Sequence, residues 1–260
     1  MELNIEGKTA IVTGASKGIG YGIAENLAKE GVNLHLTARN EKNLKLLKKK
    51  LDIKYNVKIY VYPLDLKSDS SAKILSKKCK DATILINNAG DIPSGSLFDI
   101  DNKKWREGWD LKVFGYINMC REFYPIIKNN GGGVILNNIG NGGETYDPLY
   151  IAGASGNSSL MSFTKALGSN SLNDKIRVLG VNPGPVDTER IFKILKNRAK
   201  KLYNDEKRYV DLLATYPLGR PAKIEEITDL ISFLVSDKAG YISGTIVTVD
   251  GGISSRNSII

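Results

Sequence analysis

A glycine-rich stretch between an apolar run and an amphipathic helix constrains this chain more than any other feature. The run Thr9-Ala10-Ile11-Val12-Thr13 has β-strand character and leads directly into Gly14-Ala15-Ser16-Lys17-Gly18-Ile19-Gly20. Glycines at this spacing permit a tight strand-to-helix turn and a close approach of the backbone to a ligand. The helix that follows points its free N–H groups at the same place, where they favour a phosphate group. The stretch therefore predicts a phosphate-binding loop at the start of an α/β fold.

The rest of the chain alternates apolar β-type runs with helical patterns. We expect strands at 8–13, 32–37, 58–62, 83–87, 133–138, 176–181 and 245–250. We expect helices near 19–30, 41–54, 69–80, 101–128, 152–170 and 224–236. Such alternation implies right-handed crossovers and a parallel sheet. The predicted fold class is α/β: a single doubly wound Rossmann domain, with a seven-stranded parallel sheet and helices on both faces.

The length suits one large domain, and no repeat or low-complexity linker marks a second one. We therefore expect a single domain over residues 1–260. One long excursion, at about 187–220 between the sixth and seventh strands, holds two helix-like pieces and is closed by Pro217 and Pro221. A segment there would lie over the carboxyl edge of the sheet, where ligands bind. We interpret it as a mobile substrate lid rather than a spacer.

The chain is basic, with 37 Lys and Arg against 28 Asp and Glu, but the charge does not indicate a nucleic-acid partner. The densest basic stretch, 42–51, sets lysines between leucines at helical spacing, with no aromatic residue to stack on a base. It is typical of a solvated helix face. No apolar run approaches membrane-spanning length, so no membrane partner is expected. Cys79 and Cys120 fit reduced thiols of a cytoplasmic protein, and their spacing matches no metal site.

Further motifs arrive in the order and spacing of one known family. They are Asn87-Asn88-Ala89-Gly90, Asn182-Pro183-Gly184-Pro185-Val186-Asp187-Thr188, Pro217-Leu218-Gly219-Arg220-Pro221-Ala222 and Val249-Asp250-Gly251-Gly252. Together with Thr13 and the glycine spacing, they resemble the short-chain dehydrogenase/reductase family over nearly the whole chain. The resemblance implies a nicotinamide dinucleotide cofactor, a small-molecule substrate and a homodimer or homotetramer.

The resemblance also implies which residues hold the cofactor. In the family, the residue at the position of Asp65 contacts adenine, and the loop at 183–188 grips the nicotinamide carboxamide. The implied cofactor-binding residues are Gly14, Ser16, Lys17, Gly18, Ile19, Gly20, Arg39, Asp65, Leu66, Asn88, Ala89, Gly90, Pro183, Gly184, Val186 and Thr188.

The residues at the end of the second strand favour NADP(H) over NAD(H). A NAD site places a carboxylate there to bind the ribose 2′-hydroxyl. Here the strand ends in Ala38-Arg39-Asn40, so Arg39 is positioned to pair with a 2′-phosphate, and Lys17 adds a second positive charge. The alternative is that both are ordinary surface cations. The only histidine, His35, falls in the middle of a strand and is interpreted as structural.

When the chain is aligned with the family through these motifs, unexpected residues fall at the family's catalytic positions. In the family, a lysine lowers the pKa of a tyrosine that acts as general acid/base, a serine orients the substrate oxygen, and an asparagine completes a proton relay. The flanking stretches 133–138 and 163–167 fix where these positions fall. The serine, tyrosine, lysine and asparagine positions are occupied by Gly140, Gly153, Asn157 and Lys112. The chain thus resembles an atypical member that lacks the Tyr/Lys pair.

Other tyrosines do not restore the pair. If Tyr150 is taken as the family's tyrosine, Ala154 falls at the lysine position. Tyr-x-x-x-Lys spacing occurs twice elsewhere, away from the start of the fifth helix, at Tyr124/Lys128 and Tyr203/Lys207. With 12 tyrosines and many lysines in the chain, such matches are expected by chance.

A rebuilt acid/base site is one account of these replacements. Lys112 is the leading catalytic candidate, because burial lowers the pKa of a lysine towards neutrality. Asn138 precedes Gly140 by two residues, so the two face one side of the strand, and its amide could orient a carbonyl. Tyr146 and Tyr150 could supply a phenol. The alternatives are that Lys112 extends its amine to solvent and that the tyrosines only close the pocket.

The sequence therefore predicts an NADP(H)-dependent oxidoreductase that interconverts a carbonyl and an alcohol on a small organic substrate. Proton donation contributes about 10²–10⁴-fold to such reactions, so an unusual donor still permits a working enzyme. Two alternatives stay open. One is a catalytically degenerate NADP-binding regulatory or scaffold protein, and the other is a non-redox, lyase-type relative on the same scaffold.

Overall fold

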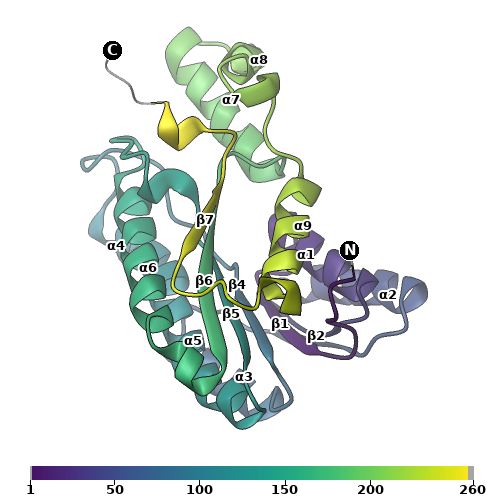
Figure 1. Ribbon diagram of the computed structural model, residues 1–260. Helices are drawn as coiled ribbons and strands as arrows, with labels where there is room; N and C mark the ends of the chain where they lie inside the picture. Colours follow the sequence, from purple (N-terminus) through teal and green to yellow (C-terminus); the bar gives the residue numbers. More distant parts are fainter. Residues whose placement is uncertain (1, 257–260) are drawn as a thin grey trace.

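The computed structural model describes residues 2–256 and contains one parallel sheet with helices on both faces (Figure 1). The strands lie in the order β3-β2-β1-β4-β5-β6-β7. Their bounds are β1 (Thr9–Thr13), β2 (Asn33–Ala38), β3 (Ile59–Pro63), β4 (Ile84–Asn87), β5 (Gly133–Asn138), β6 (Ile176–Pro183) and β7 (Ile246–Val249). The predicted doubly wound α/β fold is confirmed, and each strand end lies within two residues of its expected position.

Two sets of helices cover the two faces of the sheet. On one face lie α1 (Gly18–Lys29), α2 (Glu41–Lys54) and α9 (Ile224–Val235) (Figure 1). On the other lie α3 (Asp69–Lys78), α5 (Gly115–Asn129) and α6 (Ile151–Gly168). The sequence of α2 determines which side of the helix packs on the sheet. Its leucines Leu44, Leu47 and Leu51 lie on one side and are buried in the core of the first face, and lysines stand between them in the sequence.

The helix expected over 101–128 is interrupted. The structure has α4 (Asn102–Trp109), then a π-helical turn (Asp110–Phe114), and then α5. A π turn has i→i+5 hydrogen bonds, so it holds one residue more per turn than an α-helix and shifts the faces of the flanking helices. Periodicity does not reveal a single extra residue of this kind. Lys112 lies in the middle of this turn.

The segment 187–220 forms a small helical unit, as its two helix-like pieces predict. It contains α7 (Glu189–Tyr203) and α8 (Tyr209–Leu213), followed by a 3₁₀ turn (Pro217–Gly219). Figure 1 shows α7 and α8 beyond the carboxyl ends of β6 and β7, away from the body of the sheet. Among residues 2–256, no helix combines the length and apolarity needed to cross a bilayer.

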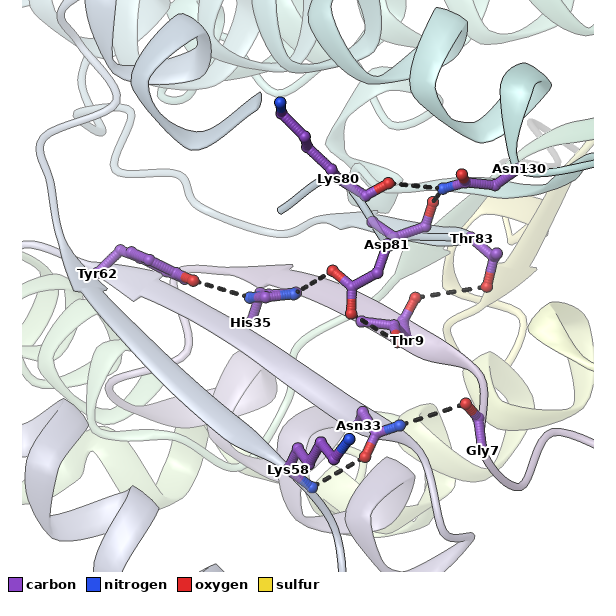
Figure 2. A network of polar contacts seen from close by, with 11 residues as sticks. Gly7, Thr9, Asn33, His35, Lys58, Tyr62, Lys80, Asp81, Thr83 and Asn130 are labelled. Carbon is purple, nitrogen blue, oxygen red and sulfur yellow. Dashed lines mark hydrogen bonds and ion pairs between the residues drawn. The ribbon is translucent and has the colours of Figure 1, made fainter. Parts of the chain in front are cut away.

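A polar network occupies the opposite, amino edge of the sheet (Figure 2). The imidazole of His35 is 3% exposed; its Nδ1 lies 3.0 Å from the Tyr62 hydroxyl, and its Nε2 lies 2.9 Å from Asp81 Oδ1. Thr9 donates to the same carboxylate. The network joins β1, β2, β3 and the segment before β4, so it fixes the strands and stands apart from the glycine loop. This placement agrees with the structural interpretation of the histidine.

Candidate active site

The glycine loop after β1 has the backbone shape that its sequence predicts. Gly14 and Gly18 have positive φ angles of +67° and +58°. Gly20 lies inside the turn, where a Cβ atom would be 2.4 Å from the Gly14 carbonyl oxygen and 2.5 Å from Asn88 Nδ2. Only glycine fits at such a distance from backbone. The loop therefore presents bare backbone at the start of α1, as phosphate binding requires.

Asparagines hold the carboxyl ends of the neighbouring strands in register with this loop. The Thr13 hydroxyl accepts hydrogen bonds from the backbone N–H groups of Asn88 (2.8 Å) and Ala89 (3.0 Å). Asn88 Nδ2 donates to the Thr13 carbonyl at 2.9 Å, and Asn138 Nδ2 donates to Asn88 Oδ1 at 2.8 Å. These bonds connect the ends of β1, β4 and β5, so the edge that the cofactor is expected to meet is rigid.

The remaining cofactor positions surround the same edge. Thr188 is the residue before α7, and a Cβ at Gly18 would lie 3.4 Å from Thr188 Cγ2, so the start of α7 lies beside the start of α1. Leu66 is buried, whereas Lys17 and Asp65 are exposed. Ile19 lies in the first turn of α1, and Pro183 is the last residue of β6. The other members lie in the loops that follow β1, β4 and β6: Ser16, Gly90, Gly184 and Val186.

Arg39 follows β2 at the surface. Its guanidinium is 55% exposed, and Nη2 lies 3.9 Å from the Asp91 carboxylate. An exposed pair at this distance is weak, worth at most about 1 kcal/mol. The guanidinium is therefore available to a stronger anion such as a phosphate group.

The four positions at which the family carries its catalytic residues converge around one loop. Asn157 on α6 donates from Nδ2 to the Gly140 carbonyl at 3.3 Å, and a Cβ at Gly142 would lie 3.3 Å from the same nitrogen. Lys112 donates from Nζ to the Ile139 carbonyl, next to Gly140, at 2.5 Å. The predicted register is thus spatially consistent, since residues from the π turn, β5 and α6 meet at Gly140.

Tyr150 occupies the space beside Gly153. A Cβ added at Gly153 would lie 2.0 Å from Cζ of the Tyr150 ring, and one added at Gly142 would lie 3.1 Å from Cε1. The ring thus lies between the loop and the first turn of α6, where a side chain at 153 would start. Tyr146, in contrast, is 78% exposed. Of the two predicted tyrosines, only Tyr150 lies among the converging residues.

Replacing Gly153 by tyrosine should displace the Tyr150 ring and destabilise the protein by about 1 kcal/mol or more, because the added side chain overlaps the ring. Tyr150→Ala should relieve most of that loss. Urea unfolding of the two single variants and the double variant gives the coupling between the positions, and we expect about 1 kcal/mol. Additive effects would show that the ring does not occupy this space.

Lys112 has an unusual environment for a lysine. Its stem lies against Gly90, where a Cβ would be 2.9 Å from Lys112 Cδ. Burial, and then the nearby guanidinium of Arg190, lower the pKa of Lys112 to about 7. The amine turns inward to the Ile139 carbonyl instead of reaching solvent. At neutral pH this group exchanges a proton readily.

Two buried amides beside Lys112 have unused acceptors. Asn138 is 7% exposed and Asn157 is 2% exposed, and among the described residues neither Oδ1 atom has a hydrogen-bond partner. The Asn138 amide nitrogen gives one of its two N–H groups to Asn88, and its Oδ1 is an acceptor without a partner. Buried unpaired acceptors are uncommon in proteins and fit a site that receives hydroxyl groups from a ligand.

Arg190 is a site residue that the sequence reasoning missed. It is the second residue of α7, and it reaches the loop after β4, donating to the carbonyls of Gly90 and Ile92. Its sequence signal is an arginine two residues after the motif that ends at Thr188. The Tyr124/Lys128 match, in contrast, is accounted for structurally, because both side chains bind Asp174 before β6.

The strand order, the glycine loop after β1 and the side chains gathered at the ends of β4, β5 and β6 define a Rossmann-type nucleotide-binding protein. Comparisons with known proteins specify the family. A family model described as enoyl-(acyl carrier protein) reductase matches residues 14–254. The chain belongs to the short-chain dehydrogenase/reductase family, a family of oxidoreductases.

Individual relatives are similar over their whole length. The chain is 30% identical over 256 residues to dehydrogenase/reductase SDR family member 4 of Caenorhabditis elegans, covering 96% of each. It is 31% identical over 254 residues to the 3-oxoacyl-(acyl-carrier-protein) reductase FabG of Chlamydia muridarum, covering 95% of this chain and 97% of the relative. The L-sorbose reductase of Gluconobacter frateurii, solved with NADPH and L-sorbose, superposes with a TM-score of 0.90 at 30% identity over the full length of both chains.

Proposed function

We propose that this protein is an NADP(H)-dependent oxidoreductase that interconverts a carbonyl and an alcohol on a small organic substrate, with Lys112 as proton donor. The observation that carries the proposal is the half-buried Lys112, whose amine donates to the Ile139 carbonyl at the point where the family positions 140 and 157 meet. A titrating group at that point can replace the missing tyrosine and lysine as the source of the proton.

The residues present fit a dinucleotide. Gly20 leaves backbone exposed where any side chain would collide, and two helix N-termini, those of α1 and α7, lie beside each other at Gly18 and Thr188. The loops after β1, β4 and β6 would hold the cofactor, with Arg39 on the 2′-phosphate. When bound, NADPH supplies the hydride that reduces the carbonyl carbon.

Lys112 then completes the reaction. The Lys112 ammonium would transfer a proton to the oxygen of the reduced carbonyl group, which leaves an alcohol and a neutral amine. Burial favours the neutral amine, so the environment that lowers the pKa of Lys112 also assists the release of its proton. In the reverse direction, the neutral amine accepts the proton of the alcohol.

The unpaired Oδ1 atoms of Asn138 and Asn157 have a role in the same proposal. Asn157 stands where the family's ribose-holding lysine is expected, and its buried Oδ1 is suited to accept a hydrogen bond from a ribose hydroxyl. Asn138 Oδ1 is suited to the hydroxyl group of an alcohol substrate. Both residues position the ligand by hydrogen bonding, and neither one transfers a proton.

Arg39→Ala should weaken NADPH binding by about 10–100-fold, because a charge-assisted hydrogen bond contributes roughly 1.5–3 kcal/mol. NADH binding should change little, since NADH has no 2′-phosphate. Tryptophan fluorescence titrations with both nucleotides give the two dissociation constants. Arg121→Ala is the matched control, because Arg121 is an exposed arginine on α5 whose guanidinium donates to Asn118 on the same helix. Equal losses for NADPH and NADH would contradict the predicted preference.

Turnover is tested by NADPH oxidation against a panel of carbonyl compounds. The panel is taken from the relatives: 3-oxoacyl thioesters, ketoses such as L-sorbose, and oxosteroids. Reduction of any member supports an oxidoreductase. Tight NADPH binding without turnover of any of them would instead support the catalytically degenerate, NADP-binding alternative.

A further inference from the structure

Arg190 and Lys112 are two cations placed on one backbone segment. The Lys112 stem packs on Gly90, and Arg190 Nη1 donates to the carbonyl of the same residue at 3.4 Å. Arg190 Nη2 donates to the Ile92 carbonyl at 3.2 Å. The side chain of Ile92 in turn lies against Gly156 of α6, next to Asn157. The segment that both cations contact therefore also packs against α6 beside Asn157.

Neither cation has a counter-ion in the part of the chain that the structure describes. Within residues 2–256, no carboxylate forms an ion pair with Lys112 or Arg190, although many of the other lysines and arginines are paired. Arg190 has only neutral carbonyl acceptors, and these leave its full positive charge uncompensated. Lys112 is half-buried and Arg190 is exposed, and the positive charge of Arg190 disfavours the ammonium form of Lys112, so an anion that contacts both side chains is favoured. The nearest carboxylate on this segment, Asp91, is turned towards Arg39.

We propose that the substrate is a carbonyl compound that also carries a carboxylate or phosphate group, and that Arg190 binds this anionic group beside Lys112. A planar guanidinium with several free N–H donors suits either anion, because both can accept two parallel hydrogen bonds. The inference rests on the proposed function and specifies the substrate class of the same site. It makes Arg190 a specificity-determining residue that no sequence motif indicated.

Binding of the anion also changes the protonation of Lys112. Arg190 from α7 acts on the charge of Lys112. The nearest titratable groups of the neighbouring elements are Tyr116 from α5, whose hydroxyl donates to the Asn138 carbonyl one residue before Ile139, and Tyr150, whose ring lies beside Gly142. Arg190 is the only one of these that carries a charge at neutral pH, and it lowers the pKa of Lys112. An anion on Arg190 cancels that repulsion and raises the pKa of Lys112. The substrate thus brings Lys112 into the ammonium form that donates the proton.

Calorimetric titration of the full chain tests two expectations without requiring turnover: that Arg190 binds an anion, and that this binding raises the pKa of Lys112. The probes are malonate and inorganic phosphate, each titrated into protein saturated with NADP⁺ at pH 7, in buffers that differ in ionisation enthalpy. We expect one of them to bind with uptake of up to about half a proton, because a group with a pKa of about 7 is half protonated at that pH. Arg190→Gln should weaken this binding by at least about tenfold, and Lys112→Met should abolish the proton uptake.

The control is Arg198→Gln, which removes the same charge from an exposed position on the same helix and should leave anion binding unchanged. Which probe binds distinguishes a carboxylate substrate from a phosphate substrate. Three results would overturn the inference: no binding of either probe, equal binding by Arg190→Gln, or a loss that affects NADPH and not the probe. The last would assign Arg190 to the cofactor.

The same data separate this inference from the proposed function. If an anion binds through Arg190 with proton uptake while no carbonyl compound is reduced, the anion site stands and the oxidoreductase proposal fails. If neutral ketones are reduced while neither anion binds, the proposed function stands and the anionic substrate class is wrong.

Discussion

Lys112→Met should lower the rate of carbonyl reduction by about 10²–10⁴-fold while NADPH still binds. Methionine fills a similar volume and has no proton to give, so the change removes the donor and keeps the packing against Gly90. Single-turnover kinetics with NADPH and a carbonyl compound found in the panel measures the effect on the chemical step. A variant that retains the full rate would show that the proton comes from another group or from water.

The pH dependence of the reaction rate of the wild-type protein is a second test of Lys112. The pKa of Lys112 is about 7, so the ammonium form is lost above that pH. Reduction should therefore slow by up to tenfold per pH unit above about 7, and alcohol oxidation, which needs the neutral amine, should slow below it. Lys112→Met should remove this inflection. If bound substrate raises the pKa as inferred above, kcat should show the inflection at a higher pH than kcat/KM.

The same substitution should stabilise the fold. An unfolded lysine titrates near 10.5 and Lys112 near 7, so between these values the unfolded chain binds more protons than the folded one. The cost of burying the amine is thus fully present below pH 7 and decreases, by at most about 1.4 kcal/mol per pH unit, as the pH rises towards 10.5. Urea unfolding should show Lys112→Met more stable than wild type at pH 7. At pH 9 the difference in the free energy of unfolding between the two proteins should be smaller. A difference that grows with pH would contradict the lowered pKa.

Gly20→Ala should abolish measurable dinucleotide binding. The new methyl group would lie 2.4 Å from the Gly14 carbonyl oxygen, which is backbone and cannot rotate away. The loop must then open, which separates Gly14 from Asn88 and moves the backbone N–H groups away from the phosphates. We expect a loss of at least about 100-fold in NADPH affinity and a destabilisation of about 1–3 kcal/mol. Fluorescence titration and urea unfolding measure the two effects.

Gly240→Ala is the matched control for that prediction. Gly240 lies in an exposed turn with a negative φ angle, where a Cβ would have one neighbour, the Asp237 carbonyl oxygen, at 3.1 Å. It is far along the chain from the cofactor loops, and its replacement should leave NADPH affinity unchanged. If both variants bind NADPH as the wild type does, the glycine loop does not carry the phosphates.

The fold was largely predictable, because each element has a strong local signal. The strands are continuous apolar runs, as burial on both faces demands, and the helices carry leucines at a spacing of three and four residues. The glycine loop needs no tertiary information, since its conformation follows from the residues that can adopt it. Two of the predicted catalytic positions, 140 and 157, are in contact in the fold, through the hydrogen bond from Asn157 to the Gly140 carbonyl.

The parts that could not be predicted depend on contacts between distant segments. Arg190 belongs to the site only because α7 folds back to the loop after β4, about 100 residues earlier in the chain. The Tyr150 ring covers Gly153 because the loop before α6 turns inward at that residue, and Tyr146, four residues before it, points outward. Neither orientation is determined by local propensity, so a side chain in such a loop can be assigned to the site only from the structure.

The π turn at Asp110–Phe114 makes the location of the proposed proton donor depend on chain length as well as on residue identity. Deleting a single residue from this turn would convert it into ordinary α-helix and rotate the residues before it by about 100° relative to α5. Lys112 would then leave Gly90 and the Ile139 carbonyl, although every side chain of the site would still be present in the sequence. A one-residue insertion or deletion in this region is therefore a direct evolutionary route by which a relative could gain or lose a lysine at this position in the fold.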